Sequence, residues 1–181
     1  MRQRMAVLLR GINLGPRRRV PMAQLRELLE EAGLRDVATY LQSGNVVLAT
    51  ELAPTALEAE MRGLISERFG FEVPVCVRSQ AELAAVVKLN PLGEFVTEPK
   101  RYQVTFLSRE LSDADVQRLQ AAAADSERIV AHGRELYSWH PDGIGRSKLA
   151  GALTDRGSGA NATARNWVTV TKLLEMTADG P

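Results

Sequence analysis

The sequence predicts an α+β protein made of two ferredoxin-like halves, each built on an antiparallel sheet. Short aliphatic runs of strand length alternate with amphipathic helical segments, and their order over residues 1–78 is βαββαβ. This order is the split βαβ arrangement, in which one strand inserts antiparallel between two parallel strands. The order βαββα recurs over residues 101–181, and residues 79–100 are expected to form a connecting helix and a linker.

The elements of the first half follow from hydrophobic periodicity and from capping residues. The first helix has Pro21 at its start and Gly33 as a left-handed cap, and the second helix opens on a capping box of Thr55 and Glu58. The expected strands cover residues 5–9, 37–42, 45–50 and 72–78, and the expected helices cover residues 21–32 and 55–69.

The second half is expected to lack a closing strand. A capping box of Ser79 and Glu82 starts the connecting helix, which ends before Asn90 and Pro91. The expected strands of this half cover residues 101–107, 128–132 and 135–140, and the expected helices cover residues 113–124, 147–155 and 163–176. The chain is therefore expected to end in a helix where the first half has its fourth strand.

Composition limits the kind of partner. The 181 residues include 23 Lys and Arg against 22 Asp and Glu, so a formal net charge of +1 gives no general attraction to nucleic acid, and an anion site must be local. The apolar run at residues 5–9 is too short for a signal peptide, and no run reaches the roughly 18 residues of a membrane span. With Cys76 as the single cysteine, we expect a soluble, cytoplasmic protein without a disulfide and without a membrane partner.

Two segments are expected to meet at one edge of the first sheet. In a split βαβ unit the loop after the first strand and the hairpin after the second strand project from the same edge. The loop, part of the stretch LLRGINLGPRRR, brings Arg10 and Asn13, and the hairpin brings Ser43 and Asn45. Beside a helix start, these residues are candidate contacts for a small anion. The alternative is that Asn45 satisfies hairpin backbone groups and that the other arginines of the loop are solvated.

Two further motifs carry candidate contacts in the second half. Ser147 and Lys148 end the stretch GIGRSK, whose glycines, serine and lysine at a helix start suit a phosphate, although a turn closed by a Ser cap accounts for them better. Arg165 and Asn166 lie in the first turn of the expected last helix, where a guanidinium opposes the helix dipole and requires an anion or a carboxylate partner. We expect Arg165 to join the edge that carries Arg10.

Several catalytic centres are excluded. His132 and His140 belong to neighbouring strands without a cysteine or paired carboxylates at ligand spacing, so no metal site is expected, and both are interpreted as strand-end histidines. Ser43 does not lie in a G-x-S-x-G elbow, and Cys76 alternates with valines in a strand, as a packed and inert thiol does. No cofactor is expected.

Nucleic acid stays a secondary candidate partner. Tyr102 and Phe106 share one face of an expected strand, and Tyr137 and Trp139 share one face of another, which is compatible with base stacking as in some ferredoxin-like sheets. A core face covered by helices explains the same four rings equally well. The two central strands of the first half contain no aromatic residue.

Four stretches together resemble a known family. LLRGINLG, VPMAQLRELLEEAGLRDVATYLQSGNVVL, GIGRSKL and TARNWVTVTKL are similar to the motifs of a bacterial family catalogued as domain of unknown function 1697. The resemblance implies a compact protein with ferredoxin-like halves and carries no reaction or ligand. Pro16 stands where the family usually has a second glycine, which argues against a role that needs a flexible loop there. The positions that match the motifs are Arg10, Gly11, Asn13, Tyr40, Ser43, Gly44, Asn45, Ser147, Lys148, Arg165, Asn166 and Trp167.

The sequence leaves three functions open. The first, which we expect, is the binding of a small anionic ligand, such as a nucleotide or a phosphate-bearing metabolite, at the loop edge. The second is a metal-free enzyme that acts on a phosphorylated substrate with the same residues as electrostatic stabilisers, although no general base is evident. The third is an interaction module for nucleic acid or protein. The sequence does not indicate the oligomeric state.

Overall fold

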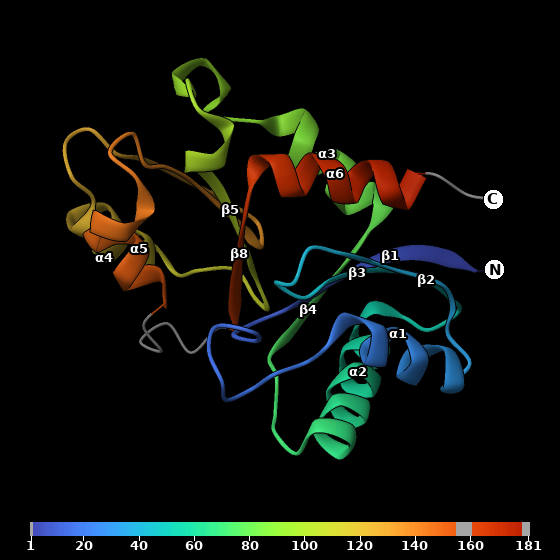
Figure 1. The fold of residues 1–181 in the computed structure, drawn as a ribbon. Helices are drawn as coiled ribbons and strands as arrows, with labels where there is room; N and C mark the ends of the chain where they lie inside the picture. Colours follow the sequence, from blue (N-terminus) through green and yellow to red (C-terminus); the bar gives the residue numbers. More distant parts are fainter. Residues whose placement is uncertain (1, 155–160, 179–181) are drawn as a thin grey trace. The chain divides into compact units, whose positions relative to one another are not determined.

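The computed structural model describes residues 2–154 and 161–178, and they form two compact units (Figure 1). The first unit contains the chain up to Ala85 and the segment from Lys172 onward, and the second contains Val86–Thr171. Each unit is built on a four-stranded sheet in which all neighbouring strands run antiparallel. The expected fold class, two ferredoxin-like α+β halves, is confirmed.

The first unit has the βαββαβ order that the sequence predicts. Its sheet has the strand order β2-β3-β1-β4, so β1 lies at the centre between β3 and β4. Figure 1 shows α1 and α2 on one face of this sheet. The elements are β1 (Gln3–Leu9), α1 (Met22–Glu31), β2 (Arg35–Tyr40), β3 (Asn45–Thr50), α2 (Pro54–Phe69) and β4 (Val75–Ser79).

The core of the first unit explains the continuous apolar run of β1. Val7 and Leu9 pack with residues of α1 and α2, including Leu25 and Met61. Leu8, which points to the opposite face, is also fully buried. A central strand that is buried on both faces cannot alternate apolar with polar residues, because a polar side chain on either face would be buried away from water.

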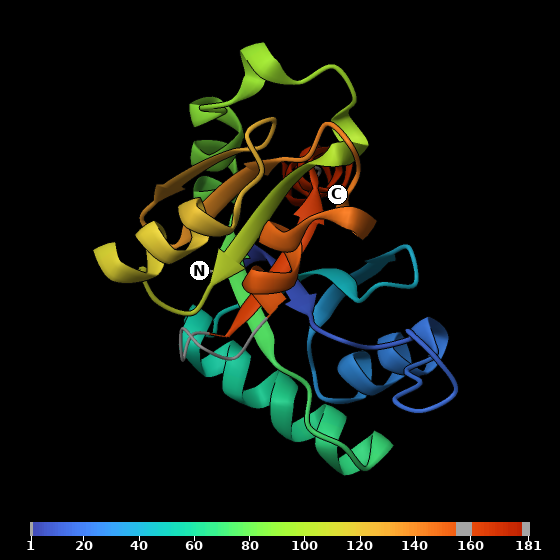
Figure 2. The same cartoon turned by 90° about the vertical axis from the view of Figure 1, so that its left-hand side faces the viewer.

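The second unit repeats the same sheet order, as β6-β7-β5-β8. In Figure 2 the helices α4 and α5 lie on one face of this sheet, where Leu107, Leu119, Leu136 and Leu149 form a buried cluster. The elements are β5 (Tyr102–Leu107), α4 (Asp113–Ala122), β6 (Arg128–His132), β7 (Glu135–Trp139), α5 (Lys148–Thr154) and β8 (Ala162–Asn166), with short 3-10 helices η1 (Gly93–Phe95), η2 (Pro99–Arg101) and η3 (Ile144–Arg146). The helices α3 (Gln80–Leu89) and α6 (Trp167–Ala178) each contribute residues to both units.

The second unit has one strand more than expected. Residues 163–166, expected to open the last helix, belong to β8, which pairs with β5 so that Thr163 lies opposite Phe106 and Arg165 opposite Val104. The helix begins at Trp167, because the side-chain oxygen of Asn166 accepts a hydrogen bond from the Thr169 N–H and caps it. A five-residue strand is too short for its periodicity to outweigh an adjoining helical pattern in the sequence. Whether these residues form a strand or a helix therefore depends on pairing with β5.

The capping predictions have mixed outcomes. The Ser79 and Glu82 box is confirmed, with the Ser79 N–H at 2.8 Å from a Glu82 carboxylate oxygen and the Glu82 N–H at 3.2 Å from the Ser79 hydroxyl. The Thr55 and Glu58 box is wrong: α2 begins at Pro54, and Glu58 instead accepts the Val77 N–H of β4 at 3.0 Å. Within the described ranges, no helix is long and apolar enough to cross a membrane.

Candidate functional site

The loop that follows β1, residues 10–19, leaves the sheet between two neighbouring segments. The last strand residue, Leu9, donates its N–H to the carbonyl oxygen of Gly44 in the β2–β3 hairpin at 2.8 Å. The next residue, Arg10, donates its N–H to Pro74 before β4 at 3.0 Å. We call residues 10–19 the basic loop, and Figure 2 shows it in blue beyond the end of β1.

The side chain of Asn13 closes the basic loop and attaches it to the hairpin. Its amide nitrogen donates to the carbonyl oxygens of Val20 at 2.9 Å and Gln42 at 2.8 Å, and its oxygen accepts the Val20 N–H at 2.9 Å. The Asn13 N–H also donates to the Arg18 carbonyl oxygen at 3.1 Å. Since both amide hydrogens are used within the protein, Asn13 positions the loop. The expected meeting of the loop and the hairpin at one edge is therefore seen directly.

The hairpin is shaped by Asn45 and Gly44. The buried Asn45 amide donates to the Tyr40 carbonyl oxygen at 2.9 Å and to the Ser43 hydroxyl at 3.0 Å, which is the backbone-satisfying alternative considered from the sequence. Gly44 has φ +81°, and a Cβ added to it would lie 2.7 Å from the Cβ of Leu9. A side chain at residue 44 would therefore push the hairpin away from β1.

The arginines of the basic loop reach the surface. Arg17, Arg18 and Arg19 are exposed and Arg10 is partly buried. Arg18 is not merely solvated: it donates to the carbonyl oxygen of Glu72, and its guanidinium carbon lies 5.2 Å from the centre of the Phe71 ring. The loop is thus held at two points, by Asn13 on the hairpin side and by Arg18 on the side of β4.

The second unit shows that the fold does not require this loop. At the equivalent edge, the Leu107 N–H donates to Arg134 in the β6–β7 hairpin at 2.9 Å, and the Ser108 N–H donates to Asn161 at 2.9 Å. These bonds match those of Leu9 and Arg10, yet residues 108–112 then lead directly into α4. The basic loop is therefore an addition to the shared architecture.

The helices that follow these two connections also differ at their starts. Ser112 caps α4 by accepting the Asp115 N–H at 3.2 Å, and Asp113 and Asp115 lie in the first turn. Among the described residues no side chain caps α1, and its first turn contains no acidic residue. The N-terminus of α1, which lies next to the basic loop, thus adds to the positive potential there.

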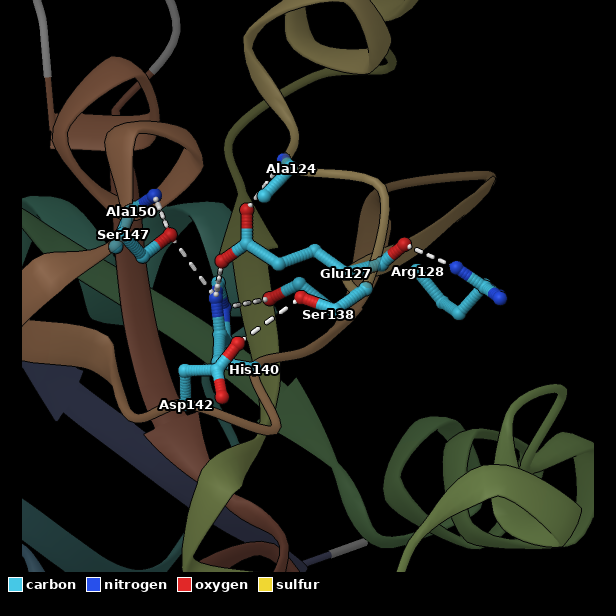
Figure 3. A network of polar contacts seen from close by, with 9 residues as sticks. Ala124, Glu127, Arg128, Ser138, His140, Asp142, Ser147 and Ala150 are labelled. Carbon is cyan, nitrogen blue, oxygen red and sulfur yellow. Dashed lines mark hydrogen bonds and ion pairs between the residues drawn. The ribbon is translucent and has the colours of Figure 1, made fainter.

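A second polar cluster lies in the second unit, around His140 of the β7–α5 connection (Figure 3). Its Nδ1 lies 2.7 Å from a Glu127 carboxylate oxygen and 3.1 Å from the Ser147 hydroxyl, and its Nε2 lies 2.9 Å from the Ser138 hydroxyl. The other Glu127 carboxylate oxygen accepts the Ala124 N–H at 2.9 Å. The Nδ1–H of His140 donates to the Glu127 carboxylate, and Nε2 on the other side of the ring pairs with the Ser138 hydroxyl.

Burial decides what this cluster can do. The order serine, histidine, carboxylate is that of a hydrolytic triad, but Ser138 is 0% exposed and His140 is 1% exposed, so the hydroxyl cannot reach a substrate. Burial acts to raise the pKa of Glu127, but hydrogen bonds from Ser147, Ala124 and His140 outweigh it and hold that pKa below its usual value. The cluster therefore fixes a carboxylate and joins three chain segments.

The same cluster accounts for Ser147 of the GIGRSKL stretch. The Ser147 hydroxyl accepts the Ala150 N–H at 2.9 Å and so caps α5, as in the turn-and-cap alternative. Lys148 is exposed at the start of that short helix. The sequence predicts only a strand-end histidine at His140 and no role for Glu127, because the members of the cluster are too far apart in sequence to form a recognisable spacing.

Arg165 lies in a different setting from the one expected. It is 9% exposed on β8 and donates to the Thr163 hydroxyl at 2.8 Å and to the Ala164 carbonyl oxygen at 2.8 Å. The argument from the helix dipole is therefore wrong, because a strand has only a small net dipole. Arg165 belongs to the second unit and Arg10 to the first, and their joint role stays a prediction.

The four aromatic residues of the second sheet belong to its core. Tyr102, Phe106, Tyr137 and Trp139 are all buried, and the ring of Tyr102 stacks on that of Trp167 with 4.8 Å between the centroids. Burial raises the pKa of Tyr102 to about 12, with the backbone of Leu92 opposing it. Of the two explanations offered by the sequence, the core face fits these rings.

Together the fold and the edge define a class of α+β protein with two ferredoxin-like halves, of which the first carries an added basic loop. The chain belongs to the family described as Protein of unknown function (DUF1697), whose family model matches residues 2–137. The matched residues include the basic loop and the hairpin, whereas the GIGRSKL and TARNW stretches lie beyond them.

A solved structure has the same fold. The conserved bacterial protein SP0830 from Streptococcus pneumoniae is 21% identical, with a TM-score of 0.78, and the alignment covers 98% of this chain and 99% of that one. No curated protein matches the sequence. The two-halved architecture is therefore shared over nearly the whole length of that bacterial protein.

Proposed function

We propose that this protein binds an anionic ligand at the edge formed by the basic loop and the β2–β3 hairpin. The observation that carries the proposal is the loop itself, which the second unit lacks at the equivalent edge. An exposed segment that the fold does not need, yet that is held by Asn13 and Arg18, is best explained by binding.

Charge supports an anion as the ligand. The whole chain has a formal net charge of +1, whereas the basic loop carries Arg10, Arg17, Arg18 and Arg19 and no acidic residue. The uncapped start of α1 adds partial positive charge at the same edge. Arg18 contacts the carbonyl oxygen of Glu72, so this bond does not use the Glu72 carboxylate.

The roles of the candidate residues follow from their bonds. Asn13, Ser43 and Asn45 position the loop and the hairpin, and the arginines make the contacts with the ligand. Lys148 is a separate exposed cation in the second unit, while Ser147 and Asn166 start helices there. Arg165 remains a proposed further contact for the same ligand.

The first ligand class to test is phosphate-bearing: a nucleotide, a sugar phosphate or a short oligonucleotide. An enzyme that acts on a phosphorylated substrate is a weaker candidate, because residues 10–19 and 41–44 contain no His, Asp or Glu to serve as a general base. Nucleic acid is disfavoured as a stacking partner by the burial of the rings at Tyr102 and Tyr137. We place the protein in the cytoplasm, in keeping with Cys76 as a buried thiol.

Thermal unfolding of the full chain tests the proposal with a panel of ATP, a sugar phosphate, a short oligonucleotide and poly-L-glutamate. A ligand at a hundred times its Kd should stabilise the protein by about 2.7 kcal/mol. Arg17→Ala with Arg19→Ala should remove that shift, and the matched control, Arg35→Ala with Arg62→Ala, should keep it because it removes two exposed charges elsewhere in the first unit. Equal shifts in both variants, or none with any polyanion, would mean that the basic loop binds no anion.

A further inference from the structure

The basic loop and the hairpin each expose a leucine. Leu14 is 86% exposed and Leu41 is 57% exposed, and these are the two most exposed large apolar side chains in the described part of the chain. Single exposed apolar residues are common on protein surfaces, so neither residue alone has a functional meaning. Their position at one edge is what distinguishes them.

One side chain fixes both leucines at that edge. Asn13 directly precedes Leu14, and its amide nitrogen donates at 2.8 Å to the carbonyl oxygen of Gln42, which directly follows Leu41. This bond holds the two segments that carry Leu14 and Leu41 together at the edge where the exposed arginines of the basic loop also lie. Preformed apolar anchors bind with little loss of conformational entropy.

Leu41 is also an unfavourable residue for its backbone conformation. Its φ is +59°, in the left-handed region that Gly and Asn adopt most readily. A leucine in this conformation is strained, and its side chain has left the core. Residues in strained backbone conformations cluster at functional sites, and Leu41 combines this strain with an exposed side chain.

We infer that the ligand of this edge is an acidic segment of a partner protein, with aliphatic side chains among its carboxylates. The inference rests on the proposed function and names its ligand. The carboxylates pair with the arginines of the basic loop, and the aliphatic side chains cover Leu14 and Leu41. Inorganic phosphate or a sugar phosphate would use the arginines but gives an isobutyl group nothing to pack against, and a single nucleotide offers only one base.

Charge also distinguishes between the macromolecules that could bind to this edge. A symmetric pairing of this edge with the same edge of a second copy would bring one set of arginines against another, and like charges at close range repel. A nucleic acid would satisfy the arginines through its phosphates and would leave the leucines in water unless one of them entered the base stack. An acidic and aliphatic segment complements both kinds of side chain at once.

The test is a selection from a phage library of random peptides about 12 residues long, a length that spans an interaction groove or edge. The full chain is the bait, and a variant with Leu14→Ser and Leu41→Asn is the counter-selection. Asn suits the backbone of residue 41, and residue 14 is exposed, so this variant should fold normally. We expect enriched peptides to combine Asp or Glu with Leu, Ile or Val.

Binding of an enriched, labelled peptide is then measured by fluorescence anisotropy. The Leu14→Ser and Leu41→Asn variant should bind it about tenfold or more weakly, since full burial of even one leucine contributes about a factor of ten or more, yet should bind poly-L-glutamate as well as the unmodified protein does. Leu52→Ser, at another exposed leucine of the first unit, is the control and should change neither affinity.

Three results would overturn the inference. They are equal peptide affinity in the Leu14 and Leu41 variant, enrichment of acidic peptides without aliphatic residues, and competition by an oligonucleotide that depends on Leu14. Each of these leaves the proposed function intact. If the variant with Arg17→Ala and Arg19→Ala bound poly-L-glutamate as well as the unmodified protein does, the proposed function would be contradicted instead. Failure of the inference and failure of the proposed function are therefore distinguishable.

Discussion

The Asn13 amide nitrogen lies 2.8 Å from the carbonyl oxygen of Gln42, and this bond joins a loop to a hairpin far along the chain. The same amide also holds both backbone groups of Val20. Asn13 adopts φ +56°, which an asparagine tolerates better than most residues. One side chain therefore gives the basic loop its closed shape and its attachment to the sheet edge.

Replacing Asn13 should free the basic loop without unfolding the sheet. Asn13→Ala removes three hydrogen bonds, so we expect a loss of about 1–3 kcal/mol in the free energy of unfolding and faster tryptic cleavage after Arg17 and Arg19. Urea denaturation and limited proteolysis measure the two effects. Gln42→Ala is the control, because Asn13 bonds the main chain of Gln42. Cleavage at an unchanged rate in Asn13→Ala would show that Arg18 alone holds the loop.

Gly44 should not accept a side chain. Gly44→Ala places a Cβ 2.7 Å from the Cβ of Leu9 at φ +81°, so we expect destabilisation of about 2 kcal/mol or more. Gly63→Ala is the opposite case: it lies inside α2 with nothing within 4 Å of the added Cβ, and should stabilise by about 0.5–1 kcal/mol. Thermal denaturation of both variants checks the pair. A neutral Gly44→Ala would mean that the hairpin can move away from β1.

The Glu127 carboxylate should contribute stability that is lost in acid. Its pKa in the folded protein is below the usual value of 4.5, so its contribution is complete well above that pH and is lost as the pH falls through the lower folded-state pKa. Glu127→Gln should therefore reduce the free energy of unfolding by about 1–3 kcal/mol near neutral pH, and by less as the pH falls below 4.5. Urea denaturation across this range is the measurement.

The exposed Glu67 supplies the control for that experiment. Glu67→Gln makes the same chemical change on the surface of α2 and should leave stability nearly unchanged at every pH. A difference between Glu127→Gln and the unmodified protein that did not vary with pH would assign the effect of Glu127 to packing rather than to its charge.

One substitution tests whether Arg165 has a structural role alone or also binds the ligand. Because it donates to Thr163 and Ala164 while nearly buried, Arg165→Ala should lower the free energy of unfolding by about 1–3 kcal/mol. If Arg165 also serves the ligand of the basic loop, the variant should lose the ligand-induced thermal shift while its unliganded form still folds. A full shift in a destabilised variant would assign Arg165 to structure alone.

Elements whose signals are local can be predicted from the sequence alone. The aliphatic run of β1, the period of α1 with Gly33 after it, and the Ser79 and Glu82 box all depend on residues within one or two turns of each other. Because the split βαβ order also fixes which strand ends share an edge, the meeting of Asn13 with the hairpin could be predicted from element order alone.

Tertiary structure decided wherever a partner distant in sequence competes with a local pattern. β8 is a strand because β5 offers it an edge, and Glu58 leaves its expected cap because the Val77 N–H needs an acceptor. The His140 cluster draws its members from β7 and from two loops, and the exposure of Leu41 depends on a hairpin backbone that no periodicity reveals. A buried polar group must find a partner somewhere in the fold, and the sequence does not state where that partner will be.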